Sequence, residues 1–242
     1  MQQPLLEVRH VSKVYRQGEI ETPVLYDIDL DVFPGDYVAL MGPSGSGKST
    51  LLNIVSGLDV PTAGDVILDG ESIVGLTESE LAEWRREHIG FIFQQYHLMP
   101  VLTAFENVEL PLLLLDMTKR ERRERVEAAL EIVGLTDRMK YYPRQLSGGQ
   151  QQRVGIARAV VTDPLLIIGD EPTGNLDVRS TGDVLRLFEI LNSDLGKTIV
   201  MVTHDPHAAE HAKTIEHLEK GILLENENKR DIRMDEIRAK LF

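Results

Sequence analysis

A glycine-rich stretch carries the pattern G-x-x-x-x-G-K-S, in which a lysine and a hydroxyl group stand where a phosphate-binding loop needs them. An apolar run that ends at Met41 precedes the stretch, and apolar residues at helical spacing follow it as far as Val55. Such a loop lets the free N–H groups and the dipole of a helix N-terminus face an anion. The residues expected to bind a nucleotide are Gly42, Pro43, Ser44, Gly45, Ser46, Gly47, Lys48, Ser49 and Thr50.

Two side chains of this phosphate loop have separate tasks. Lys48 would bring a positive charge to the β- and γ-phosphates, and the hydroxyl of Ser49 would bind Mg²⁺. The alternative is a glycine-rich turn that happens to precede a lysine, but such a turn requires neither a buried strand before it nor a helix after it. Kinases, GTPases, motors and transport ATPases all use such loops, so this one predicts nucleotide binding but no particular reaction.

A second glycine-rich segment precedes another helical pattern. Ser147 and Gln150 have the S-x-x-Q spacing of a capping box, which is a sufficient structural reason for both of them. The cap does not account for Gly148 and Gly149, because each glycine costs a helix about 1 kcal/mol relative to alanine. We therefore predict a second anion-binding helix start. Two such starts about a hundred residues apart suggest two distant phosphates or one nucleotide shared by two copies of the chain.

Three further residues have side chains suited to hydrolysis. Asp170 and Glu171 end the apolar run that begins at Leu165, and His204 follows the strand pattern 198–203. Beside a phosphate loop, Asp170 would hold the water shell of Mg²⁺ and Glu171 would polarise the attacking water. His204 would contact the γ-phosphate from the same edge of the sheet. The alternatives are a surface cap for one acid and a structural role for the histidine.

The order of the strand and helix patterns that carry these site residues predicts an α/β protein with a P-loop NTPase core. The N-terminal part has mostly antiparallel strand patterns, of which the first spans Leu5–Val11. A helical insertion follows, with capping boxes at Thr103 and Thr118, and strands and helices alternate after it. The predicted parts of the single domain 1–242 are a core with an antiparallel β subdomain (about 1–95 and 160–228), a helical subdomain (about 96–159) and a charged C-terminal helix (about 231–242).

Composition narrows the possible partners. Lys and Arg number 26 against 39 Asp and Glu, and the net charge of −13 argues against a general nucleic-acid surface, which needs a basic face. The chain has no cysteine, which excludes disulfides and thiolate metal sites. The N-terminus lacks the pattern of a secretory signal, and the longest apolar runs are far shorter than the ~20 residues of a membrane span. We expect a soluble protein that reaches a membrane only through a partner.

Together these motifs resemble the nucleotide-binding subunit of an ABC transporter, over nearly the whole chain. The segments 93–98 and 171–177 are similar to those of the branch that includes lipoprotein-release, macrolide-export and cell-division ATPases. Gly169 departs from the family pattern, in which a branched residue or alanine is usual, and the departure concerns packing. The resemblance implies that Tyr15 stacks on adenine, Gln94 is the Q-loop glutamine near Mg²⁺ and the attacking water, and Ser147 to Gln150 form the signature segment. It also implies that Gly174, Asn175, Leu176 and Asp177 form the D-loop and that His204 is the switch histidine.

The resemblance also implies an activity and partners. The expected protein is a Mg²⁺-dependent ATP hydrolase that dimerises head to tail, with ATP between the phosphate loop of one copy and the signature segment of the other. It would power a membrane permease for export or lipoprotein release, from the cytoplasmic face of the membrane, and bind no nucleic acid. The alternative within the branch is an ATP-driven regulator of a membrane partner that controls cell-wall hydrolases, without transport of a substrate. A chromosome or DNA-repair ATPase is disfavoured by the acidic charge and by the absence of a heptad insert.

We expect the permease to dock beside Gln94, because the longest apolar stretch of an otherwise polar region lies close to it in the sequence. Part of that stretch must belong to the core. The expected docking residues are Tyr96, His97, Leu98, Met99 and the run Leu110 to Leu115.

Overall fold

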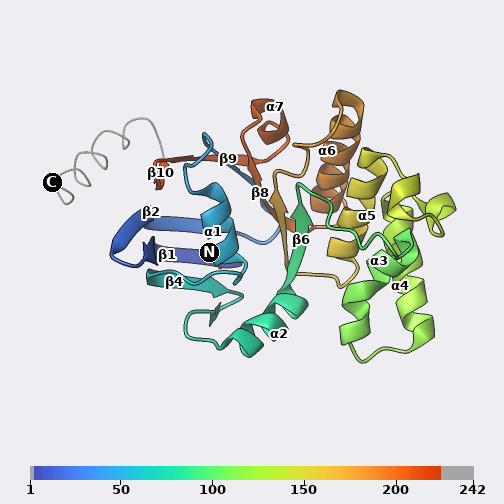
Figure 1. Cartoon of the computed structure of the whole chain (residues 1–242), viewed down its shortest axis with the longest axis horizontal. Helices are drawn as coiled ribbons and strands as arrows, with labels where there is room; N and C mark the ends of the chain where they lie inside the picture. Colours follow the sequence, from blue (N-terminus) through green and yellow to red (C-terminus); the bar gives the residue numbers. More distant parts are fainter. Residues whose placement is uncertain (1–2, 225–242) are drawn as a thin grey trace.

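A computed structural model describes residues 3–224 of the 242-residue chain, so the predicted C-terminal helix at about 231–242 lies outside the described part. The predicted α/β architecture with a P-loop NTPase core is confirmed (Figure 1). Six strands form the central sheet in the order β10-β9-β3-β8-β7-β6, and all neighbours pair in parallel except β10 with β9. Their bounds are β3 Tyr37–Met41, β6 Ile89–Phe93, β7 Leu166–Asp170, β8 Thr198–Thr203, β9 Thr214–Glu219 and β10 Ile222–Leu224.

A second, antiparallel sheet has the order β2-β1-β4-β5. The expected end of the first strand near Val11 is wrong, because β1 stays paired with β2 as far as Gln17 opposite Ile20. The outer half of this ribbon is largely exposed, so its polar residues, Tyr15 among them, give no apolar alternation to detect. The bounds are β1 Leu6–Gln17, β2 Ile20–Val32, β4 Ala63–Leu68 and β5 Glu71–Ser72.

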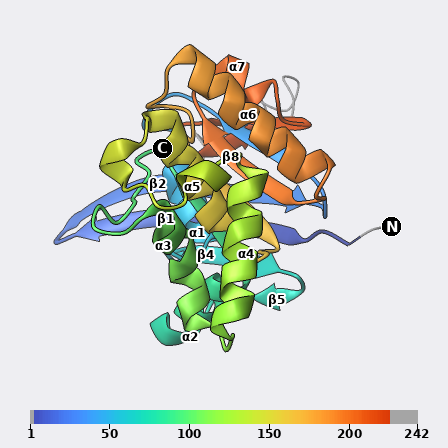
Figure 2. The same ribbon diagram turned by 90° about the vertical axis from the view of Figure 1, so that its right-hand side faces the viewer.

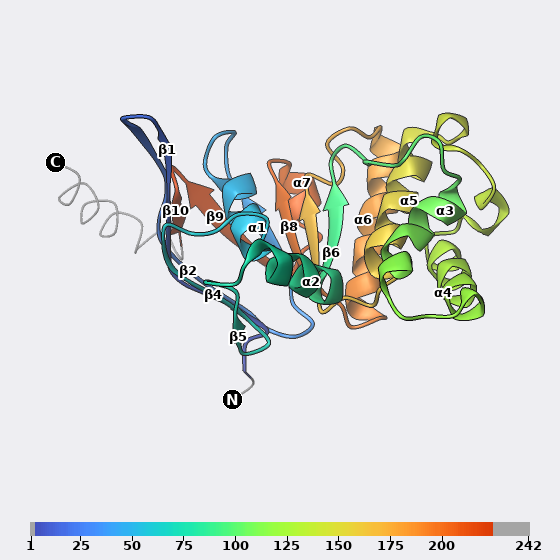
Figure 3. The ribbon, with the colours of Figure 1, turned by 60° about the horizontal axis from the view of Figure 1, so that its bottom comes forward.

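The helices divide between the two sides of the central sheet. Figures 1 and 3 show α3 to α6 on the side away from the antiparallel sheet, with α1 between the two sheets. The capping boxes expected at Thr103, Thr118 and Ser147 are all formed. The helices are α1 Lys48–Val55, α2 Glu78–His88, α3 Ala104–Glu109, α4 Lys119–Ile132, α5 Gly148–Val160, α6 Val178–Ser193 and α7 Pro206–Ala209, with 3₁₀ turns at Leu110–Leu114, Thr136–Arg138 and Pro143–Gln145.

Alternate residues of the central strands belong to two separate hydrophobic cores. Ile167 packs in the core with α3 to α6, whereas Leu166 and Ile168 pack in the core that includes α1 and the antiparallel sheet. Burial on both faces is typical of parallel strands. In Figure 2 α6 crosses in front of β8 on the helical side. The central sheet therefore separates the two hydrophobic cores, and packing on both of its faces fixes the strand ends that carry the residues at its edge.

The glycine that departs from the family pattern has a packing explanation. A Cβ atom at Gly169 would lie 3.4 Å from both Phe188 Cε1 and Pro172 Cγ, so the ring of Phe188 already fills the space that a larger side chain would occupy. Phe188 is fully buried and stacks on Tyr37 with 6.1 Å between ring centroids. The glycine at position 169 therefore leaves room for the aromatic ring of Phe188 from α6.

Candidate nucleotide site

Four loops meet at one edge of the central sheet because they follow the carboxyl ends of neighbouring strands. The strand register brings together Met41, Thr203, Val202, Asp170 and Phe93. The residues that come next in the chain are Gly42, Gln94, Glu171 and His204. In open α/β sheets this edge is where ligands bind. The three residues expected to act in hydrolysis are thus gathered beside the phosphate loop.

The phosphate loop curls through left-handed glycine conformations. Gly45 and Gly47 have φ angles of 79° and 102°, and α1 begins directly after Gly47. The ammonium group of Lys48 lies inside the loop and donates to the carbonyl oxygens of Gly42 and Pro43, at 2.7 and 2.9 Å. The loop therefore surrounds a buried cation at the N-terminus of a helix, which suits a polyphosphate.

A cavity of about 360 Å³ opens over this loop, and Glu171 lines part of it. Its lining residues are Val24, Ser44, Gly45, Gly47, Lys48, Ser49, Thr50 and Glu171. Its lining provides the hydroxyl groups of Ser44, Ser49 and Thr50 and the ammonium group of Lys48. These hydrogen-bond donors and this positive charge fit the phosphates of a nucleoside triphosphate.

Ser49 and Asp170 form an all-oxygen pair at the floor of the site. The hydroxyl of Ser49 donates to Asp170 Oδ1 at 3.3 Å. Burial raises the pKa of Asp170, and the nearby charge of Glu171 raises it further, against the opposing influence of Ser49 and Lys48. A divalent cation would relieve the cost of two neighbouring carboxylates. Oxygen donors in this arrangement fit Mg²⁺.

Glu171 and His204 lie in direct contact. His204 Nδ1 is 2.9 Å from Glu171 Oε1. Glu171 has a φ angle of 44°, which is unusual for a residue with a side chain and persists only where the surroundings hold it. Its N–H donates to the carbonyl oxygen of Val202 at 2.9 Å, and its own carbonyl oxygen accepts from Gly174 N–H at 3.0 Å. The backbone thus turns sharply at the residue expected to polarise water.

Gln94 is joined to the turn that follows Glu171. The side chain of Asn175 donates to the carbonyl oxygen of Gln94 at 3.2 Å. A Cβ at Gly174 would come within 2.6 Å of Gln94 Nε2, so a larger residue there would push the Gln94 side chain out of its present position. The loops after β6 and β7 therefore pack against each other. The hydrogen bond from Asn175 to Gln94 was not expected from the sequence.

Tyr15 is held beside the phosphate loop by two polar contacts. Its hydroxyl donates to Asp59 Oδ2 at 2.8 Å, and the hydroxyl of Thr50 in the first turn of α1 is also within hydrogen-bonding reach. The ammonium group of Lys13 lies 4.8 Å from the ring centroid and donates to Asp59 Oδ1 at 2.6 Å. The ring is 43% exposed, which leaves area for an adenine to cover. Lys13 and Asp59 were not expected from the sequence, where they occur in ordinary turn and strand patterns.

The signature segment, Ser147 to Gln150, lies apart from the cavity. In Figures 1 and 3, α5 and α1 stand on opposite sides of β6. The two glycines have a packing reason that the sequence did not reveal: a Cβ at Gly148 would lie 2.8 Å from Tyr96 Oη, and one at Gly149 would lie 2.6 Å from Ser180 Oγ. The glycines are therefore not by themselves a sign of anion binding.

Asp177 has a structural task at the start of α6. Its Oδ1 accepts from the N–H groups of Arg179 and Ser180, both at 3.0 Å, and its Oδ2 accepts from Ser180 Oγ at 2.8 Å. These hydrogen bonds, led by that from the Ser180 N–H, lower the pKa of Asp177. Because Ser180 also contacts Gly149, the D-loop and the signature segment form one contiguous surface.

Known proteins are similar to this chain in sequence and in fold. The chain is 50% identical over 223 residues to the ABC transporter ATP-binding protein YvrO of Bacillus subtilis. The aligned part covers 92% of this chain and 97% of YvrO. It is 48% identical to a macrolide export ATP-binding/permease protein, MacB, of Syntrophobacter fumaroxidans, over 90% of this chain but only 31% of that longer protein. Among the described residues no helix is long and apolar enough to cross a membrane.

A solved structure and a family model agree with these relatives. The ATP-binding cassette MJ0796, in a dimeric post-hydrolysis state bound to ADP and Pi, superimposes with a TM-score of 0.83 at 43% identity, over 91% of this chain and 97% of that one. The model of the family described as ABC transporter matches residues 25–174, which include the phosphate loop, Gln94, the signature segment and the acidic pair. The chain belongs to the ABC transporter family, as one of its ATP-binding cassettes.

Proposed function

We propose that this cassette hydrolyses ATP with Mg²⁺ as a head-to-tail homodimer, and that the cycle drives a membrane permease for export, from the cytoplasmic face of the membrane. The observation that carries the proposal is the separation of two helices: Lys48 of α1 lines the cavity, whereas α5, which Ser147 caps, lies on the other side of β6. One copy cannot bring both to one nucleotide, whereas two copies can. The dimeric relative with ADP and Pi and the relatives named for macrolide export support it.

The residues of one copy have distinct tasks in this reaction. Lys48 and the N-terminus of α1 bind the phosphates, and Tyr15 stacks on the base. Glu171 orients and polarises the attacking water. His204 binds Glu171 through Nδ1, which leaves Nε2 to face the γ-phosphate. Ser49, Gln94 and Asp170 would hold Mg²⁺, which supplies charge neutralisation for the phosphates when bound.

A shared site makes different demands on the two helix starts, and a pair of variants tests this. Lys48→Ala should weaken ATP binding by the monomer, whereas Ser147→Arg should leave that binding intact and prevent the ATP-dependent dimer. Thr118→Arg is a matched control, because it removes the same type of capping box from α4, at a cost of about 1 kcal/mol, away from the site. Calorimetric titration and size exclusion with ATP and Mg²⁺ measure both. Equal loss of monomer affinity in the Lys48 and Ser147 variants would refute the shared site.

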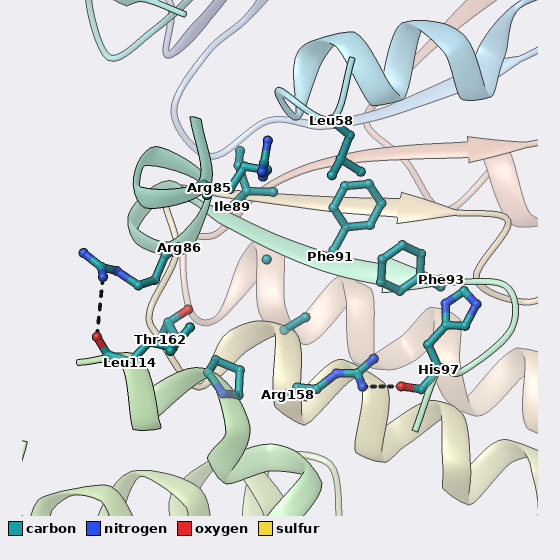
Figure 4. Close-up of a pocket in the computed structure, with 14 residues that line it drawn as sticks. Leu58, Arg85, Arg86, Ile89, Phe91, Phe93, His97, Leu114, Arg158 and Thr162 are labelled. Atoms are coloured by element: carbon teal, nitrogen blue, oxygen red, sulfur yellow. Dashed lines mark hydrogen bonds between the residues drawn. The ribbon is translucent and has the colours of Figure 1, made fainter. Parts of the chain in front are cut away.

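The docking of the permease is proposed at a groove beside the Q-loop, with a cavity volume of about 520 Å³. Figure 4 shows Phe91, Phe93 and Leu58 lining it, with His97 at one end and Leu114 at the other. Arg158 donates to the carbonyl oxygen of His97 at 2.6 Å and so fixes the segment after Gln94. The remaining lining residues are Ala82, Arg85, Arg86, Ile89, Gly90, Pro111, Ala159 and Thr162.

The structure changes which residues of the expected docking surface can be used. Leu112 is fully buried and therefore belongs to the core, whereas Leu98 is partly buried and packs against the core of the helical side. Met99 and Leu114 are exposed by 49% and 68%. We expect Leu114→Glu to leave ATP binding intact and abolish co-purification with the permease. Leu195→Glu, at an exposed leucine outside this groove, is the control that should still co-purify; recovery of both variants with the permease would move the docking site elsewhere.

A further inference from the structure

One glutamine outside every expected site links the signature helix to the catalytic edge. Gln152 lies in the second turn of α5 and is 0% exposed. Its Nε2 donates to two backbone carbonyl oxygens, of Phe93 at 3.2 Å and of Pro172 at 2.7 Å. Phe93 immediately precedes Gln94, and Pro172 immediately follows Glu171. A single amide group therefore fastens both loops to α5.

The orientation of this amide follows from its partners. If Oε1 and Nε2 were exchanged, an acceptor oxygen would face two carbonyl oxygens, which have no hydrogen to offer. In the observed orientation Oε1 is buried with no hydrogen-bond partner among the described residues. A buried acceptor without a partner is unfavourable. The side chain is therefore suited to this place by its two donated hydrogen bonds.

The segment that Gln152 holds includes the strained residue of the site. Glu171 has a φ angle of 44°, and such a conformation requires contacts that fix the chain on both sides of it. On the amino side its N–H binds Val202 O, and on the carboxyl side Gly174 N–H binds its carbonyl oxygen. The hydrogen bond from Gln152 to the carbonyl oxygen of Pro172 is a third contact that fixes this turn, and it comes from α5.

We propose that Gln152 is a positioning residue for hydrolysis: through the Pro172 and Phe93 carbonyls it holds the turn that presents the Glu171 carboxylate and the strand end that presents Gln94. The inference rests on the proposed ATP hydrolysis and adds a residue to it. Because both bonds come from α5, any shift of that helix acts on the two loops together. Gln152 itself is buried in the chain and touches no substrate.

The adjacent glutamine gives a matched control. Gln151 Nε2 donates to Leu146 O at 3.1 Å, so it too makes an amide-to-carbonyl hydrogen bond from α5, but within its own helix start. The variants Gln152→Met and Gln151→Met each remove the amide and keep the length of the side chain. We expect Gln152→Met to lower kcat at least tenfold with the Kd for ATP, measured without Mg²⁺, within twofold of wild type. Gln151→Met should change neither quantity more than twofold.

Two further measurements separate positioning from general stability. Hydrogen exchange of the Glu171 and Gly174 N–H groups should accelerate in Gln152→Met, while exchange within α6 stays at the wild-type rate. In a Glu171→Ala background, adding Gln152→Met should lower the residual rate by much less than tenfold, because only the effect through Gln94 remains. A full tenfold further loss in that background, equal kcat in the two methionine variants, or uniformly faster exchange overturns the proposal.

The two proposals fail in different ways. If wild type hydrolyses no ATP, the proposed function falls, and exchange at Glu171 and Gly174 still decides whether Gln152 holds the turn. If Gln152→Met does not fold, Gln152→Asn takes its place, since it keeps the amide but is one methylene too short to reach both carbonyls. The same split between kcat and Kd is expected there, and a wild-type kcat would overturn the inference.

Discussion

Gly149→Ala tests whether the signature segment and the D-loop are one packed surface. An alanine Cβ would lie 2.6 Å from Ser180 Oγ and 2.8 Å from Ser180 Cβ, so Ser180 must move. Its hydroxyl now donates to Asp177 Oδ2 at 2.8 Å. Overpacking costs about 1–3 kcal/mol, and loss of a hydrogen bond to a carboxylate costs about 1.5–3 kcal/mol. Alanine returns about 1 kcal/mol of helix propensity, so the expected net loss is about 1.5–5 kcal/mol.

Urea unfolding followed by circular dichroism measures this loss, with Gly182→Ala as the control. Gly182 lies inside α6 with no neighbour within 4 Å of a Cβ, so alanine there should stabilise by about 0.5–1 kcal/mol. In the Gly149→Ala background, Ser180→Gly should recover part of the loss because it removes both contacts, whereas Ser180→Ala keeps its Cβ and should recover less. If Gly149→Ala were as stable as Gly182→Ala, the close contact between Gly149 and Ser180 would be refuted.

Three other changes have expected outcomes. Glu171→Gln should keep ATP affinity, abolish turnover and accumulate an ATP-bound dimer in size exclusion; steady-state ATPase near wild type would contradict the role of Glu171. Burial disfavours the charge of Asp59, but hydrogen bonds from Lys13 and Tyr15 outweigh it and lower its pKa, so its stabilising effect is present above the unfolded value of about 4 and lost as pH falls through the folded pKa. Asp59→Asn should therefore lose about 1–2 kcal/mol at pH 7 in thermal unfolding, with a gap to wild type that narrows below about pH 4; a gap independent of pH would speak against the ion pair. Gly169→Ala should leave Tm unchanged or slightly higher, and a marked fall would mean that Phe188 does not leave room for a methyl group.

Local signals predicted the parts of the site that depend on neighbouring residues in the chain. The phosphate loop between a strand and a helix, the strand Thr198–Thr203 and the capping boxes each depend on about ten consecutive residues, and all are found. The contact of His204 with Glu171 also agrees with the expectation that both lie at one sheet edge. Its direct form, ring to carboxylate, depends on strand register and was not predictable from the sequence.

Contacts between distant residues explain what the sequence did not reveal. Gln152 meets its partners 59 and 20 residues away, and within the chain it is one of three consecutive glutamines of which only the first is in a capping box. Asp59 acquires its role only when β1 and α1 come together around Lys13. The glycines of the signature segment seemed too costly for a helix because Ser180 and Tyr96, which require them, lie elsewhere in the chain.

The position of α1 and α5 on opposite sides of β6 has a genetic consequence. In the proposed pair, each nucleotide would draw its phosphate loop from one copy and its signature segment from the other. A cell that expresses one copy with Lys48→Ala and one with Ser147→Arg would assemble mixed pairs, in which one site contains both lesions and the other contains neither. Two alleles that are each inactive alone should then complement one another, up to the output of one working site per mixed pair.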